Sequence, residues 1–164
     1  PRKLSLIAYD TNSNKLLWNQ DIGPAEDRES VYFRHIMRAD GTTRMVATVW
    51  PNRYIVFDSE KGTIIKDARL AGYIGWTDRN SALYSYPYLL TGARRQLGKG
   101  MAFDLIALNL ESGKVDWTYE IETRNSYLTF PTADTLNFVV KDNRVFIGRS
   151  DAKIMSFRHG DVRK

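Results

Sequence analysis

Residues suited to metal or acid–base chemistry are few and scattered along this sequence. There are two histidines, His35 and His159, and no cysteine, which excludes disulfides and thiolate metal sites. Neither histidine forms a cluster with nearby acidic residues of the kind that binds a metal. Asp10, Asn12 and Asn14 have the spacing that opens a calcium loop, but the glycine and closing glutamate of an EF-hand are missing, and a hairpin turn explains the same residues. We therefore predict no catalytic residue, no metal site and no cofactor.

A basic, glycine-rich segment at residues 92–100 is the clearest candidate for a binding element. Arg94, Arg95 and Lys99 bring three positive charges to what we predict to be a solvated hairpin loop. The functional alternative is an interaction loop for an acidic partner or a phosphate group. The whole chain has 24 Lys and Arg against 19 Asp and Glu, a net charge of +5. Because no basic helix or known nucleic-acid motif accompanies this excess, we expect no nucleic-acid binding.

Aromatic residues gather just before this basic segment. They are Tyr73, Trp76, Tyr84, Tyr86 and Tyr88. Tyr and Trp are enriched at the centres of protein interfaces, so a binding surface is one interpretation. We expect at least half of them to pack in the core instead.

A segment that repeats along the chain predicts the elements that position all these residues. Its copies are 6–18, 54–66 and 105–117, with a truncated copy at 154–158. A small side chain marks the same place in each copy, at positions 8, 56, 107 and 156, so the spacings are 48, 51 and 49 residues. A period this long, made only of β-type segments, is typical of a four-stranded propeller blade with extended loops.

Each copy is predicted to be a β-hairpin. A short apolar strand leads to an Asp or Asn whose side chain accepts hydrogen bonds from backbone amides two residues on. Four residues later stands Gly or Asn, the residue types that adopt a positive φ most easily. These pairs are Asp10 and Asn14, Asp58 and Gly62, and Asn109 and Gly113.

The segments between the copies also resemble strands. Alternating apolar residues predict strands at 44–50 and 88–92, and a pair of strands around an Asp-Asn turn at 138–149. Helical periodicity is absent, and only 25–37 has room for a turn or two of helix. The fold class expected is therefore all-β.

These motifs resemble the repeat of the pyrroloquinoline-quinone (PQQ) enzyme-like, or quinoprotein, β-propeller family. The tryptophan-docking motif of that family, A-x-D-x-x-x-G-x-x-x-W, is matched with one change in each of two copies, while a third copy keeps the turn and has Lys66 in place of the tryptophan. In this family the docking tryptophan packs between neighbouring blades, a structural role. The matching residues are Ala8, Asp10, Asn14 and Trp18; Asp58 and Gly62; and Ala107, Asn109, Gly113 and Trp117.

The resemblance implies a partial propeller of about three four-stranded antiparallel blades. Residues 1–22 would be the last two strands of one blade, 23–70 and 71–122 two whole blades, and 123–164 the first three strands of another. Because propellers close into rings of four to eight blades, we expect the remaining blades in the same polypeptide or in another chain. No apolar run approaches the roughly 20 residues of a membrane span.

The function expected is a non-catalytic scaffold or protein–protein interaction module. The resemblance also implies two alternatives, a segment of a PQQ-dependent dehydrogenase and a propeller that binds carbohydrate or another ligand. The resemblance implies that the dehydrogenases of the family hold PQQ over a tryptophan and use Glu, Asn and Asp to bind Ca²⁺ and provide a base, and no residue here aligns with those positions. The resemblance alone favours a periplasmic or extracytoplasmic location.

Overall fold

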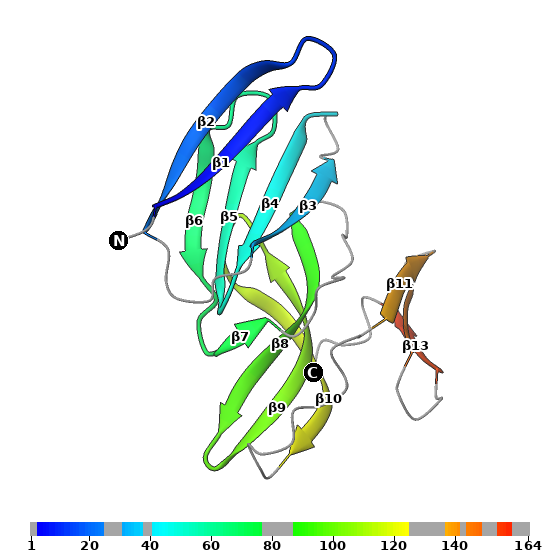
Figure 1. Ribbon diagram of the computed structural model, residues 1–164. Coiled ribbons are helices and arrows are strands. Elements are labelled where there is room, and N and C mark those ends of the chain that lie inside the picture. Colours follow the sequence, from blue (N-terminus) through cyan, green and yellow to red (C-terminus); the bar gives the residue numbers. More distant parts are fainter. Residues whose placement is uncertain are drawn as a thin grey trace. The chain divides into compact units, whose positions relative to one another are not determined.

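All regular structure in the described part of the chain is β-strand. The computed structural model describes residues 3–24, 31–37, 41–76, 87–124, 137–141, 144–148 and 154–158, and these contain thirteen strands and no helix (Figure 1). The strands form four separate antiparallel sheets. The prediction of an all-β protein is therefore confirmed.

The chain divides into two compact units, residues 1–69 and 70–164. In the first unit, β1 (Lys3–Asp10) and β2 (Lys15–Pro24) form a two-stranded sheet. A four-stranded sheet follows with its strands adjacent in chain order. Its strands are β3 (Val31–Met37), β4 (Thr43–Val49), β5 (Arg53–Asp58) and β6 (Ile64–Arg69).

The second unit contains a four-stranded and a three-stranded sheet, again with consecutive strands adjacent. The four-stranded sheet comprises β7 (Gly75–Trp76), β8 (Tyr88–Leu97), β9 (Gly100–Asn109) and β10 (Val115–Arg124). The three-stranded sheet comprises β11 (Asn137–Lys141), β12 (Arg144–Gly148) and β13 (Ile154–Arg158). The strands predicted between the repeat copies are present in these sheets.

One sequence prediction about local structure is wrong. Of the segment considered for a short helix, Val31–Met37 forms strand β3, and residues 25–30 lie outside the described residues. The segment pairs along its whole length with β4, from Val31 opposite Val49 to Met37 opposite Thr43. Its β-branched and aromatic residues favour this pleated pairing.

The repeated segments fold into three hairpins of the same geometry. Asp10, Asp58 and Asn109 each accept two backbone amide hydrogen bonds on Oδ1, from the residues two and three positions later, at 2.8–3.3 Å. The fourth residue after each has a positive φ, 53° at Asn14, 69° at Gly62 and 77° at Gly113. The local turn chemistry therefore specifies the same loop three times, with Asn tolerated where the other copies have Gly.

The three hairpins also share an irregularity in strand pairing. In the first, Ala8 lies opposite Trp18 while the next residue, Tyr9, lies opposite Leu16, so Leu17 forms a bulge. The register shifts at the same place in β5–β6 and in β9–β10. Equivalent residues of the three copies therefore project from the same face of their hairpins.

The core of the first unit lies between its two sheets. Leu6 and Ile22 of the β1–β2 sheet pack with Ala47, Ile55 and Phe57 of the β3–β6 sheet, in a cluster that also contains Val49. Partly buried residues complete it, and these are Leu4, Trp18, Val31, Met45 and Ile64. Two sheets thus pack face to face through alternate side chains, the arrangement that gives a sheet a buried face.

Burial differs between the hairpins. In β5 and β9 successive residues are buried, so both faces of these central strands are covered. In β1 buried and exposed residues alternate, and only the face toward the β3–β6 sheet is covered.

Candidate functional site

Trp18 joins the two sheets of the first unit at the repeated turn. It lies on β2, and its indole Nε1 donates a hydrogen bond to the Ser59 carbonyl oxygen at 3.2 Å. Its ring also contacts Phe57 edge to face, with ring centroids 5.8 Å apart. Trp18 of the first hairpin therefore packs on the turn of the next hairpin along the chain, through one hydrogen bond and one aromatic contact.

Gly62 is the residue that makes room for this tryptophan. A Cβ built on Gly62 would lie within 3 Å of three atoms of the Trp18 ring. The φ of +69° at Gly62 is itself unfavourable for residues with a side chain. Two independent requirements, the turn conformation and the ring above it, thus select glycine at this position.

The other docking-motif residues occupy equivalent places in the remaining hairpins. Ala107 is fully buried on β9, opposite Trp117 of β10, which is itself almost fully buried. Lys66 of β6 occupies the tryptophan position of its copy, opposite Val56. The three hairpins therefore share a backbone geometry, while the docking position holds tryptophan in two of them and Lys66 in the third.

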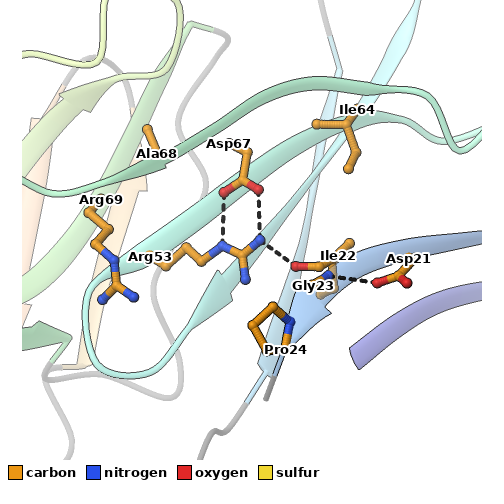
Figure 2. Close-up of a pocket in the computed structure, with 9 residues that line it drawn as sticks. All are labelled: Asp21, Ile22, Gly23, Pro24, Arg53, Ile64, Asp67, Ala68 and Arg69. Carbon is orange, nitrogen blue, oxygen red and sulfur yellow. Dashed lines mark hydrogen bonds and ion pairs between the residues drawn. The ribbon is translucent and has the colours of Figure 1, made fainter. Parts of the chain in front are cut away.

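Arg53 connects the same two sheets at the other end of β5 (Figure 2). Its guanidinium forms a forked ion pair with Asp67 of β6, through Nε at 2.8 Å and Nη2 at 2.6 Å, and Nη2 also donates to the Ile22 carbonyl oxygen of β2. Planar two-point pairing of this type holds both groups in a fixed orientation. Trp18 and Arg53 therefore tie the β1–β2 sheet to β5 at opposite ends of that strand.

A hollow of about 640 Å³ adjoins Arg53, between the end of β2 and strands β5 and β6 (Figure 2). Its charged groups bond to neighbouring protein atoms: Arg69 donates to the Asn52 side chain, and Asp21 accepts from the Gly23 amide. Two aspartates and two arginines line the hollow. The ion pair between Arg53 and Asp67 stabilises the junction of the two sheets.

A second polar cluster surrounds Asp104 in the second unit. Asp104 is fully buried on β9 and accepts a 2.9 Å hydrogen bond from Nε of Arg95, whose Nη2 also contacts Glu120 at 3.3 Å. The hydrogen bond to Asp104 raises the pKa of the Arg95 guanidinium. Nearby, the Tyr73 hydroxyl lies 3.1 Å from Thr118 Oγ1, and burial raises the pKa of this phenol. Asp104 is thus a buried carboxyl group that is hydrogen-bonded by Arg95 of the neighbouring strand.

The solvated hairpin loop predicted at residues 92–100 is wrong, because most of it is strand, whereas the interaction role of Arg94, Arg95 and Lys99 stays a prediction. Residues up to Leu97 continue strand β8, and Gly98 and Lys99 form a tight turn into β9. Arg95 pairs with Asp104, and the Arg94 guanidinium lies 5.9 Å from the centroid of the Phe103 ring. Two of the three basic side chains therefore contact groups of the neighbouring strand, because Arg94 lies directly opposite Phe103 and Arg95 lies diagonally across from Asp104.

The turn carboxylates have a structural explanation. The Ser13 hydroxyl and the amides of Asn12 and Ser13 lower the pKa of Asp10. The Lys61 amide is the main group that lowers the pKa of Asp58, with further contributions from the Glu60 amide and from Arg44. Hydrogen bonds to the charged form cause this direction of shift.

The histidines and the aromatic residues singled out in the sequence fall in different parts of the chain. His159, Tyr84 and Tyr86 lie outside the described residues, and His35 lies on β3. Tyr73 and Trp76 are buried and Tyr88 is half-buried. Among the residues the structure describes, no three His, Cys, Asp or Glu side chains group as metal ligands. Over the same residues, the structure contains no helix long and apolar enough to cross a membrane.

A scan against protein-family models found no matching family, and a search of curated proteins found no similar sequence. The resemblance to the PQQ enzyme-like repeat therefore stays a prediction.

Sequence reasoning missed the two charged clusters. Arg53, Asp67 and Asp104 carried no motif that set them apart. The signal available in the sequence was the position of Asp104. It is a charged residue within an apolar strand, at a position where the pattern of apolar residues predicts burial.

Proposed function

We propose that this chain is a non-catalytic scaffold of stacked propeller-type sheets, and that it binds other protein chains through sheet faces. The observation that carries the proposal is the seat of Trp18 on the turn from Ser59 to Gly62. This contact links consecutive hairpins of the repeat and performs no chemistry. Its atoms serve only to fix one sheet against the next.

The arrangement of strands supports stacked blades. Each sheet among the described residues contains consecutive strands in antiparallel order, as blades do. The central strands β5 and β9 are buried on both faces, which suits sheets that have neighbours on two sides. The docking-motif residues lie at equivalent positions of three hairpins with one backbone geometry.

The exposed apolar residues support a binding role. Ile7, Tyr9, Leu16 and Leu17 all lie on the β1–β2 hairpin and are each more than half exposed. A contiguous apolar patch of this kind marks an interaction surface more often than scattered single residues do. The charged clusters at Arg53 and Asp104, by contrast, bond within their own unit.

Site-specific photocrosslinking tests the binding role. Benzoylphenylalanine is introduced at Tyr9, and at the exposed turn residue Glu111 as the matched control. We expect a discrete protein adduct from position 9 that disappears when Ile7→Glu is added. Equal labelling from both positions, or an adduct that Ile7→Glu leaves unchanged, would contradict the proposal.

A second assay tests the absence of catalysis. The chain is incubated with PQQ and Ca²⁺, and dye-linked alcohol oxidation is followed alongside quenching of tryptophan fluorescence. We expect neither turnover nor quenching. Turnover would replace the scaffold proposal with the dehydrogenase alternative.

A further inference from the structure

The exposed patch of the first hairpin has buried counterparts in the second. The repeat places Ile7, Tyr9 and Leu16 at the positions of Ile55, Phe57 and Ile64, and the shared bulge keeps each set on one face. Ile55, Phe57 and Ile64 belong to the core cluster, where the β1–β2 sheet covers them. Ile7, Tyr9 and Leu16 have the same apolar character but are 52%, 58% and 53% exposed. We call these three residues the leading face.

The β11–β13 sheet exposes the opposite kind of face. The repeat places Ser156 at the position of Val56, and Phe146 lies opposite Ser156 just as Val46 lies opposite Val56. Val56 alternates with Ile55 and Phe57, so Val46 and Val56 lie on the far side of their sheet from the core cluster. Val46 and Val56 are buried, whereas Phe146 is 36% exposed and Ser156 is exposed. We call Phe146 and Ser156 the trailing face.

The two faces are complementary within the repeat. In the first unit, Leu6 of the β1–β2 sheet packs against Ile55 and Phe57. Leu6 lies on the same face of β1 as Ala8, which the repeat places at the position of Val56. A face of the trailing type therefore covers a face of the leading type. The exposed leading face and the exposed trailing face are therefore of the two kinds that cover each other in the first unit. They lie on different sheets of one chain. Such a pair of unlike patches makes a head-to-tail contact between copies.

From this we infer that the leading face of one copy binds the trailing face of a second copy of this chain. The inference rests on the proposed function, because it takes the stacking of sheets in the first unit as the template for the contact between copies. It names the partner that the scaffold proposal leaves open.

The turn next to the leading face refines the contact. Asn14 occupies the position of Gly62, and it carries the Cβ that at Gly62 would collide with the Trp18 ring. A tryptophan in the pose of Trp18 therefore does not fit over Asn14. Strands β11, β12 and β13 contain no tryptophan, so the sheet that carries the trailing face can lie against this turn without such a clash.

Paired variants of the whole chain test this contact. Ile7→Glu places a charge on the leading face, Phe146→Glu places one on the trailing face, and Leu97→Glu is the control because Leu97 is similarly exposed, at 37%, outside both faces. Circular dichroism and thermal unfolding verify that each variant folds, and sedimentation velocity gives its mass. Wild type and Leu97→Glu are expected to associate into multiples of 18.9 kDa, whereas each face variant alone is monomeric.

Mixing the two face variants gives the decisive result. Ile7→Glu retains an intact trailing face and Phe146→Glu an intact leading face, so the mixture is expected to form a dimer with one copy of each. Association of Phe146→Glu by itself would overturn the inference, because it indicates contact between two leading faces. A monomeric wild-type chain would overturn it as well. In either case, a Tyr9 photoadduct with a different protein would leave the proposed scaffold function standing.

A crosslink maps the same contact. The chain has no cysteine, so single-cysteine variants react only at the introduced site. A short bis-maleimide is expected to join Tyr9→Cys to Phe146→Cys in a mixture, and to leave either variant alone uncrosslinked. Efficient crosslinking of Tyr9→Cys to itself would contradict the head-to-tail contact.

Discussion

In the β3–β6 sheet the repeated hairpin has both faces covered, whereas in the β1–β2 sheet the same hairpin has one face covered. The backbone geometry, the turn hydrogen bonds and the bulge are the same in both. Hydrophobic sequence alone therefore does not decide burial here. The apolar residues of this repeat are suited to a covered face, and the neighbouring sheet decides whether they are covered.

The strongest test of this difference removes equivalent side chains from the two hairpins. Ile55→Ala is expected to lower the free energy of unfolding by about 2–5 kcal/mol, because it leaves a cavity in the core cluster. In the Phe146→Glu background, which we expect to be monomeric, Ile7→Ala is expected to cost less than about 1 kcal/mol, as at an exposed site. Urea unfolding followed by circular dichroism measures both. Equal losses for Ile55→Ala and Ile7→Ala in that monomeric background would show that Ile7 is covered within a single copy.

Gly62→Ala tests the room beneath Trp18. Strain at positive φ is expected to cost about 1 kcal/mol and displacement of the ring about 2 more. Gly23→Ala is the control, because Gly23 also has a positive φ but no atom lies near its added Cβ. In the Trp18→Ala background the cost of Gly62→Ala should fall to the strain alone. If Gly62→Ala destabilises the Trp18→Ala variant as much as it destabilises wild type, its effect does not come from contact with the Trp18 ring.

Trp18→Ala tests the contact between the sheets directly. Because Trp18 is only partly buried, we expect a loss of about 2 kcal/mol, below the range for a fully buried tryptophan. Leu17→Ala, on the exposed bulge beside it, is expected to have little effect. Similar losses for the two variants would mean that the docking contact does not stabilise the first unit.

The smallest expected effect concerns the turns. The pKa of Asp58 is lowered in the folded state, so its stabilising effect is present above the ordinary carboxyl pKa of 3.8 and is lost as the pH falls through the lowered value. Asp58→Asn keeps the acceptor oxygen that Asn109 uses in its own turn, and removes the titration. Acid unfolding of this variant should depend less on pH below 4 than that of wild type. If Asp58→Asn and wild type show the same pH dependence of unfolding, titration of Asp58 does not contribute to acid unfolding.

Prediction of the local structure succeeded where short-range chemistry decides it. The turn residues Asp10, Asp58 and Asn109, with Asn14, Gly62 and Gly113 after them, predicted hairpins that the structure contains. The 92–100 segment was misjudged because glycine and arginine are frequent in loops, while in the structure Asp104 and Phe103 give the arginines partners across the strand pair. The short helix considered at 25–37 failed for a similar reason, since pairing with β4 stabilises Val31–Met37 as a strand.

The sequence by itself determined the β class, the repeat and its turns, because these depend on side-chain alternation and on hydrogen bonds within a few residues. Only the tertiary structure decided which apolar faces are covered and that Trp18 lies over Gly62. It also decided that Arg53 pairs with Asp67 and that Asp104 pairs with Arg95. Those outcomes depend on which strands of distant sequence become neighbours. Local preference does not specify that choice, because the same hairpin is stable with one face covered or with two.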